Sequence, residues 1–267
     1  MIKELEYEEI MAFQDEIERE KSLNLFFRNN LKLYKYKRDY NVFMTEGLLL
    51  MHLKRSAFIL LKYAPFDEKE VASFILQKKP IMINGPKYAL SPLEKELGEG
   101  WKKKYLKMMD IDRSSFKKVF PRSDNLSLLL TYSDFLSAAK LHSRDEEFGE
   151  GLETKEKREA WAEKKEEEME YPFAAVGYKV GGKLVGTAFL SSATKESAMV
   201  VGVFVDKEWR GKGIGTMLTE EITDIGLNEH RINKLCLFPS EKKAESIYSR
   251  LGYMEAGEYA YFRNLSI

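Results

Sequence analysis

The sequence predicts a mixed α/β protein (α+β) made of two halves with one order of elements. Predicted strands and helices alternate along the 267 residues, which favours helices packed on a sheet. In each half the order is hairpin, strand, helix, strand, helix, strand, which indicates a degenerate internal repeat. In the second half a glycine-rich turn, 210–215, joins a predicted strand to a predicted helix.

The first half is predicted as a domain over 1–120 and opens with a helix. Apolar residues at helical spacing predict this helix over 5–30. Asp67 is the predicted N-cap of a second helix, because Glu70 follows at capping-box spacing. Ser91, with proline next to it, is the predicted N-cap of a third helix. The predicted strands are 42–44, 48–53, 57–63, 81–83 and 105–109.

The second half is predicted as a domain over 121–267, because the polar, turn-rich stretch 121–125 indicates a boundary. Glutamates and lysines spaced four apart within 145–170 favour a solvated helix. The other predicted helices are 133–142, the segment from the glycine turn to about 228, and 242–251. The predicted strands are 126–130, 174–179, 183–190, 198–205, 235–238 and 256–262.

Composition narrows the class of protein. Basic and acidic residues balance at 43 each, so no overall field attracts nucleic acid or an anionic membrane, and the longest apolar runs are too short to span a bilayer. The chain opens on an acidic stretch without a secretory pattern, and Cys236, the one cysteine, reads as a small buried hydrophobe. We therefore expect a cytoplasmic protein. The three histidines lack metal-ligand spacing, so no metal is expected.

The turn Arg210-Gly211-Lys212-Gly213-Ile214-Gly215 has the composition of a phosphate site. The first N–H groups of a helix have no internal partner, and the helix dipole adds partial positive charge there. A phosphate satisfies both, and glycines let it approach the backbone. Arg210 and Lys212 add positive charge. The turn is therefore predicted to bind a pyrophosphate.

Two other phosphate motifs are excluded by position. A P-loop needs glycine where Asp206 stands and Ser or Thr where Gly213 stands. A dinucleotide fingerprint that starts at Gly211 needs glycine where Thr216 stands. The matching stretch of the first half, 64–67, has no glycine and carries a proline without an N–H, so no phosphate is expected there.

Val203-Phe204-Val205 followed by Arg210-x-x-Gly213-x-Gly215 resembles the acetyl-CoA signature of the GNAT superfamily of N-acetyltransferases. The run 244–253 resembles the second cofactor-side motif of that family. The resemblance covers roughly 126–262. It implies a GNAT-like acyl-CoA N-acyltransferase fold in the C-terminal domain and a degenerate GNAT-like N-terminal domain.

The resemblance also implies a mechanism. The strand 198–205 would splay from its neighbour to admit the pantetheine arm, and Gly202 is consistent with a bulge that opens this gap. Backbone N–H groups near Phe204 and Val205 would polarise the thioester carbonyl. Tyr248 would protonate the leaving thiolate, although its helical spacing alone favours a core residue.

The implied cosubstrate is acetyl-CoA. Ser240 stands near the position where the family often has asparagine, and it could substitute as a hydrogen-bond partner. No acid lies within 198–205, so the sequence identifies no general base. The expected cofactor-binding residues are Val203, Phe204, Val205, Arg210, Gly211, Lys212, Gly213, Ile214, Gly215, Thr216 and Ser240.

The expected activity is transfer of an acetyl group from acetyl-CoA to a small-molecule or peptide amine by direct attack. A non-catalytic acyl-CoA-binding module is an alternative of another class, and such a module would not need Tyr248. A tandem-fold aminoacyl transferase is a third reading, disfavoured by the neutral net charge. No nucleic-acid or membrane partner is expected. The sequence leaves undecided whether the protein forms a homodimer.

Overall fold

The computed structural model describes residues 1–37, 40–53, 57–146, 148–169, 172–240 and 242–267. The chain forms two compact units. Unit 1 comprises Met1–Met108 and Glu255–Ile267, and unit 2 comprises Met109–Met254.

The two units divide at a different position from the boundary that was predicted between residues 120 and 121. It falls within strand β6 (Trp101–Asp112), and nearly all of the last strand, β12 (Met254–Asn264), belongs to unit 1. Composition marks exposed turns such as 121–125, whereas strand pairing decides which unit a segment joins.

Unit 1 contains a sheet with the strand order β1-β2-β3-β4-β5-β12-β6. β4 pairs with β5 in parallel, and the β1/β2, β2/β3, β3/β4 and β5/β12 pairs are antiparallel. Its further strands are β1 (Lys3–Leu5), β2 (Tyr40–Thr45), β3 (Leu48–Leu53), β4 (Ala57–Lys62) and β5 (Met82–Pro86). Its helices are α1 (Tyr7–Ile10), η1 (Met11–Phe13), α2 (Gln14–Arg19), α3 (Leu25–Lys37), α4 (Glu68–Lys78), α5 (Lys87–Leu90), η2 (Ser91–Leu93) and α6 (Glu94–Leu97).

Both faces of the unit 1 sheet are covered, because successive side chains of a strand point to opposite faces. Leu48 and Leu50 pack with α4 in one apolar cluster. Leu49 and Met51 pack with Ile10 and the helices α2 and α3 in another. A strand buried on both faces needs an almost continuous apolar run, which 48–51 supplies.

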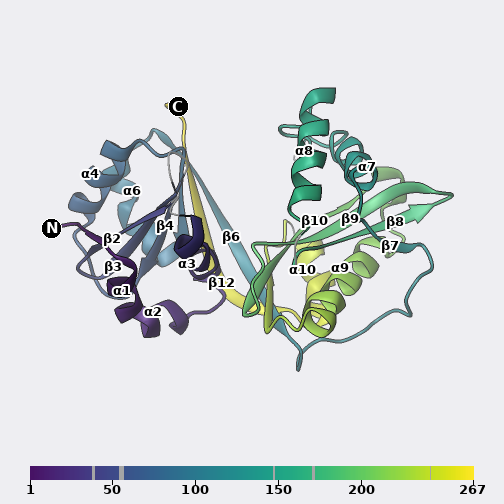
Figure 1. The fold of residues 1–267 in the computed structure, drawn as a ribbon, viewed down its shortest axis with the longest axis horizontal. Helices are drawn as coiled ribbons and strands as arrows, with labels where there is room; N and C mark the ends of the chain where they lie inside the picture. Colours follow the sequence, from purple (N-terminus) through teal and green to yellow (C-terminus); the bar gives the residue numbers. More distant parts are fainter. Residues whose placement is uncertain (38–39, 54–56, 147, 170–171, 241) are drawn as a thin grey trace. The chain divides into compact units, whose positions relative to one another are not determined.

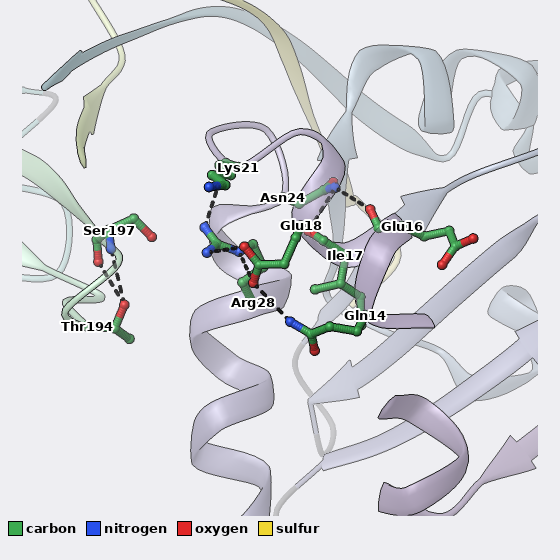
Figure 2. A network of polar contacts seen from close by, with 9 residues as sticks. All are labelled: Gln14, Glu16, Ile17, Glu18, Lys21, Asn24, Arg28, Thr194 and Ser197. Atoms are coloured by element: carbon green, nitrogen blue, oxygen red, sulfur yellow. Dashed lines mark hydrogen bonds and ion pairs between the residues drawn. The ribbon is translucent and has the colours of Figure 1, made fainter. Parts of the chain in front are cut away.

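The helix predicted over 5–30 is broken before Asn24. Glu20 leaves the helical region with φ −118° and ψ 73°. The Asn24 side chain donates to the carbonyls of Glu16 and Ile17, each at 3.4 Å, and replaces N–H groups that a continuing helix would supply (Figure 2). Arg28 is buried and pairs with Glu18 at 2.7 Å. Apolar periodicity carries no information about such polar contacts. The prediction from it therefore gave one continuous helix where the chain has a break between α2 and α3.

Unit 2 contains strands in the order β6-β11-β10-β9-β8-β7. Only the β10/β11 pair is parallel among the pairs described in this unit. Its strands besides β6 are β7 (Leu126–Leu128), β8 (Ala174–Val180), β9 (Lys183–Ser191), β10 (Ser197–Val205) and β11 (Lys234–Leu237). Its helices are α7 (Tyr132–His142), α8 (Lys155–Glu167), η3 (Lys207–Trp209), α9 (Ile214–Asp224), the π-helical turn Ile225–Glu229 and α10 (Lys242–Leu251).

The two faces of the unit 2 sheet carry different helices (Figure 1). α9 and α10 pack on one face in an apolar cluster that includes Leu218 and Leu251. α7 and α8 pack on the other face, where aromatic side chains such as Phe189 and Phe204 gather. β10 therefore contributes to both clusters and lies at the centre of the unit.

The predicted mixed α/β class is confirmed, and several local predictions hold. Asp67 caps α4, α10 has the predicted bounds, and β8 and β9 form the predicted hairpin. Ser91 lies within a continuous helical run and caps no helix, because the helical run already begins at Lys87. The charged helix begins only at Lys155. No helix in the described ranges is long and apolar enough to cross a membrane.

Candidate functional site

A β-bulge interrupts β10 in the middle of the sheet. Val201 pairs with Phe189 and Phe204 pairs with Thr187, so two residues of β10 face one residue of β9. Gly202 lies in this bulge with φ +61°, and a Cβ there would come within 2.5 Å of the Phe189 ring. Both the backbone angle and the close ring therefore require glycine.

The edge of β10 that faces β11 is uncovered at the bulge. The parallel ladder has only three pairs, and the last joins Met199 to Cys236. Two residues further on, Val201 is 38% exposed, although it lies mid-strand in a buried sheet. Phe204 is again buried at 4%. Solvent therefore reaches β10 at Val201 and, in part, at Gly202 and Val203.

The helix after β10 begins without a side-chain cap. Gly213 is the N-cap of α9 with φ +77°, and it has no side chain to accept from the first N–H groups. The first turn of α9 contains no acidic residue. A Cβ on Gly211 would meet no atom within 4 Å, so the backbone before the helix borders open space. This helix start can therefore accept an anion.

Two cations flank the turn, and both have partners. The Arg210 Nε donates to the Val205 carbonyl at 2.9 Å, and its guanidinium lies 3.4 Å from an Asp145 carboxylate oxygen. The Lys212 Nζ lies 4.1 Å from the centre of the Trp209 ring. Asp145 offsets part of the positive charge at the turn, whereas the Lys212 ammonium lies against the face of an aromatic ring.

The predicted cofactor-binding residues differ in their exposure to solvent. Phe204, Ile214 and Thr216 are buried at 4% or less, so only their backbone can meet a ligand. Val203 and Val205 are half-buried and pack toward α9. Arg210, Gly211, Lys212 and Ser240 are exposed, and Gly213 and Gly215 are half-exposed. Several of these residues could therefore contact a ligand only through their backbone N–H and C=O groups.

Tyr248 lies on α10 in the core of unit 2. It is 8% exposed, and its ring centre lies 5.9 Å from that of Tyr253. Burial raises the pKa of the Tyr248 phenol to about 12. The Tyr253 hydroxyl bonds to Thr223 at 2.8 Å, whereas Tyr248 has no hydrogen bond from its hydroxyl among the described residues. Tyr248 therefore keeps its proton at neutral pH, and no hydrogen bond to a described residue uses that proton.

Sequence reasoning missed a buried polar chain under the bulge. The His142 Nε2 lies 2.7 Å from the Thr187 Oγ1, and this hydroxyl donates to the Gly202 carbonyl at 3.0 Å. The two side chains are 45 residues apart in the sequence, so no local spacing could reveal the pair. From the sequence, His142 could be judged only as a possible metal ligand, and its spacing from the other histidines gave no support for that role. No group of residues fit to hold a metal ion occurs in the parts of the chain that the structure describes.

A second feature that sequence reasoning missed is the segment before β7, which is fastened to α9. The Glu220 carboxylate accepts from the Val119 N–H at 2.7 Å and from the Phe120 N–H at 3.1 Å. Lys118 pairs with Asp224 at 2.6 Å. These bonds bring the Phe120 ring to 3.7 Å from the place of a Cβ on Gly213. An aromatic side chain therefore lies at the rim of the glycine turn.

Part of the chain that contains this geometry matches a known protein family. The sequence model described as "Acetyltransferase (GNAT) family" matches residues 136–253, which supports an acyl-transfer function. These residues contain the bulge, the glycine turn, His142 and Tyr248. No curated protein matches the sequence.

Solved structures resemble the whole fold. A GCN5-related N-acetyltransferase from Kribbella flavida has 15% identity, 88% of this chain and 93% of that chain covered, and a TM-score of 0.64. A protein from Drosophila has 13% identity, 98% of each chain covered and a TM-score of 0.69. A tandem GNAT protein from the clavulanic acid biosynthesis pathway has 10% identity, 98% and 97% covered, and a TM-score of 0.54. These likenesses establish a GNAT-like fold along most of the chain.

Proposed function

From the premise that residues 136–253 form a GNAT acetyltransferase domain, we propose that this chain transfers an acetyl group from acetyl-CoA to an amine. The observation that carries the proposal is the uncapped start of α9 beside the bulge in β10. One feature suits a pyrophosphate and the other suits a carbonyl. They are joined by eight residues of chain, 206–213, so both belong to one continuous backbone surface.

The residues present fit the cosubstrate. The N–H groups at the start of α9, with Lys212 beside them, would hold the pyrophosphate. The uncovered edge of β10 would receive the pantetheine arm by backbone hydrogen bonds, as a strand edge receives a peptide. The bulge would present N–H groups of 203–205 to the thioester carbonyl. Ser240 lies exposed three residues after β11 and would contribute at most one hydrogen bond.

The chemistry is a single displacement at the thioester carbon. The amine nitrogen, in its neutral form, forms a bond to that carbon while the carbon–sulfur bond breaks. Backbone N–H groups of the bulge stabilise the negative charge that develops on the carbonyl oxygen. Tyr248 gives its proton to the departing sulfur, and the proton that the amine nitrogen loses passes to water and restores the phenol. The products are an amide and free CoA thiol.

Titration calorimetry with acetyl-CoA, and with ATP and NAD as controls, tests the proposal. Gly215→Ala is the informative variant. Its Cβ would meet only Val205 Cγ2, at 3.8 Å, so the added methyl is tolerated and raises helix propensity. We expect an unfolding midpoint no lower than that of the wild type and roughly tenfold weaker acetyl-CoA binding, because the methyl stands where the pyrophosphate approaches.

Gly100→Ala in unit 1 is the matched control, since its Cβ would also make one ordinary contact, at 3.7 Å. This variant should bind acetyl-CoA as the wild type does. If the wild type binds no acetyl-CoA at millimolar concentration, or binds ATP and NAD equally well, the proposal is wrong.

The burial of Tyr248 favours one second candidate, a non-catalytic acyl-CoA-binding module, because a buried phenol also suits a core residue. Tyr248→Phe separates the two. An acetyltransferase should lose about 100-fold in kcat while acetyl-CoA affinity stays the same. A module should bind acetyl-CoA equally well with either residue and show no turnover with any amine.

The acceptor is proposed only as a class, a small-molecule or peptide amine. An ammonium group cannot attack, so the acceptor must lose a proton first, and the rate should rise with pH toward the pKa of the acceptor. Because the only cysteine is buried and needs no oxidising compartment, we propose that the reaction takes place in the cytoplasm.

A further inference from the structure

We propose that Thr187 and His142 are positioning residues that hold the β10 bulge in the shape that receives the thioester carbonyl. The inference rests on the proposed function, since it concerns the same strand. Neither residue reaches the reacting atoms: Thr187 is fully buried and His142 is 4% exposed. Both act through the backbone of Gly202 and the residues that follow it.

The first step of the argument is the Gly202 carbonyl. Gly202 and Val203 lie outside the β9/β10 register, because the ladder passes from Val201 directly to Phe204. A partly buried carbonyl that loses its ladder partner costs free energy unless another donor replaces it. The Thr187 hydroxyl is that donor, at 3.0 Å. A side-chain hydroxyl of β9 thus donates the hydrogen bond that a backbone N–H would donate in an unbroken ladder.

The second step fixes the direction of each hydrogen bond. A carbonyl oxygen only accepts, so the single hydroxyl hydrogen of Thr187 goes to Gly202. The Thr187 oxygen must then accept at its other contact, 2.7 Å from the His142 Nε2. The imidazole proton therefore sits on Nε2. Burial lowers the pKa of His142 to about 4, so the ring is neutral at pH 7 and exists as this one tautomer.

The third step is the packing of the imidazole. Four aromatic rings surround it, with centres at 5.5 Å (Phe148), 6.0 Å (Trp161), 5.9 Å (Phe189) and 5.3 Å (Phe204). Phe204 belongs to β10 itself, two residues beyond Gly202. His142 therefore holds the strand on both sides of Val203, through Thr187 at one end and through ring contact at the other. Val203 and Phe204, whose N–H groups are proposed to meet the carbonyl, lie within this clamp.

Two substitutions at Thr187 separate positioning from simple packing. Thr187→Val keeps the size and removes the hydroxyl, whereas Thr187→Ser keeps the hydroxyl and removes a methyl. We expect Thr187→Val to lower kcat at least tenfold while the affinity for acetyl-CoA, anchored mainly at α9, changes less than threefold. Thr187→Ser should recover kcat to within about threefold of the wild type. Equal kcat in wild type and Thr187→Val, or equal loss in both variants, would overturn the proposal.

A readout independent of turnover uses the free protein. Long-range ¹⁵N–¹H correlation spectra report the imidazole tautomer, and we expect His142 to be neutral with its proton on Nε2 from pH 8 down to pH 6. Amide hydrogen exchange at Val203 and Phe204 should be at least tenfold faster in Thr187→Val and near wild type in Thr187→Ser. A proton on Nδ1, or unchanged exchange in Thr187→Val, would overturn the positioning role.

The same design distinguishes the two proposals from each other. If the wild type fails to bind acetyl-CoA, the proposed function is wrong, and the tautomer and the exchange rates still decide whether Thr187 and His142 hold the bulge. If acetyl-CoA binds and turns over but Thr187→Val behaves as the wild type in kcat and in exchange, the proposed function stands and the positioning inference falls.

Discussion

In each unit one strand pairs in parallel with the next over three residues only. In unit 1 Ala57, Phe58 and Ile59 of β4 pair with β5, and in unit 2 Ser197, Ala198 and Met199 of β10 pair with β11. Counting onward from these pairs aligns the two strands residue by residue. Leu61 of β4 then corresponds to Val201 of β10.

Beyond the shared pairs the two strands differ. The β3/β4 ladder runs through six pairs without a break, whereas the β9/β10 ladder breaks at Gly202. Leu61 is 1% exposed and Val201 is 38% exposed. At this equivalent position, β4 is therefore shielded from solvent in unit 1, whereas β10 is accessible to solvent in unit 2. The open position coincides with one bulge and one glycine, and the order of the neighbouring strands is equivalent in the two units.

The helices that follow show the same contrast. The Asp67 carboxylate accepts from the N–H groups of Lys69 and Glu70, each at 3.0 Å, so the start of α4 already holds an anion of its own. Gly213 leaves the start of α9 unsatisfied by any side chain. The comparison indicates that the proposed ligand site differs from the matching region of unit 1 by lacking three groups: a side-chain cap, a Cβ and a ladder pair.

The largest expected difference between the units is in stability. Leu61→Ala should lower the free energy of unfolding by about 3 kcal/mol, because it leaves a cavity in a packed core. Val201→Ala should lower it by less than about 1 kcal/mol, since the side chain is already partly in water. Urea denaturation of both variants measures the contrast. Equal losses would show that the two strands are buried alike in solution.

Introducing a carboxylate at the open helix start should abolish the contrast in anion binding. We expect Gly213→Asp to weaken acetyl-CoA binding about 100-fold, or about 2.7 kcal/mol, because the negative charge repels the pyrophosphate. Gly213→Asn is the uncharged control of the same shape, and asparagine tolerates positive φ better than most residues. It should lose tenfold at most by calorimetry. Equal loss in both variants would indicate that backbone strain, and no charge effect, governs the site.

The support of the bulge should make unit 2 sensitive to acid. The pKa of His142 falls to about 4 in the folded chain by burial, and the only opposing influence is the nearby Asp145 carboxylate. Because the unfolded chain binds a proton near pH 6.5 and the folded chain does not, the stabilisation is complete above pH 6.5 and is lost as pH falls toward 4. Between pH 7 and pH 5 the loss should be about 2 kcal/mol.

The control for this acid sensitivity is His142→Phe, which removes the titrating group. His52 in unit 1 also has a lowered pKa, first through burial and then through Lys78, so only the difference between wild type and variant isolates His142. Urea denaturation at several pH values gives this difference. If the pH dependence is the same in both proteins, His142 titrates as a free histidine does.

The smallest expected effect comes from the cap of unit 1. Asp67→Ala should lower the free energy of unfolding by about 1 kcal/mol, because two N–H groups lose their acceptor. Asp67→Asn keeps a capping oxygen and should stay near wild type. Neither should change acetyl-CoA affinity, since proline and phenylalanine precede Asp67 where unit 2 has its glycines. New acetyl-CoA binding by Asp67→Ala would show that the cap alone closes this junction.

Local features of the fold could be predicted from the sequence, and long-range ones could not. The Asp67 cap, the hairpin around Gly181-Gly182 and the bounds of α10 depend on neighbouring residues. The break before Asn24 depends on contacts seven or eight residues back, which apolar periodicity does not register. The assignment of β12 to unit 1 depends on strand pairing between distant parts of the chain, which no composition shift indicates.

The candidate site divides in the same way. The glycine turn is a contiguous motif, so its proposed role in anion binding could be inferred from the general properties of helix N-termini. The role of Tyr248 came from family resemblance, because its spacing alone indicates a core residue, and its burial fits both readings. Thr187 and His142 had no sequence signal at all, since one is an ordinary strand residue and the other an ordinary helix residue until the fold joins them.

The assignment of β12 to unit 1 has a consequence for the order in which the chain can fold during synthesis. β12 lies between β5 and β6 in the sheet of unit 1, so that sheet lacks an interior strand until the ribosome has released residues 255–264. All the residues of unit 2 precede that point. The unit encoded second can therefore finish folding first, while the unit encoded first waits as an unfinished sheet with β5 as a free edge.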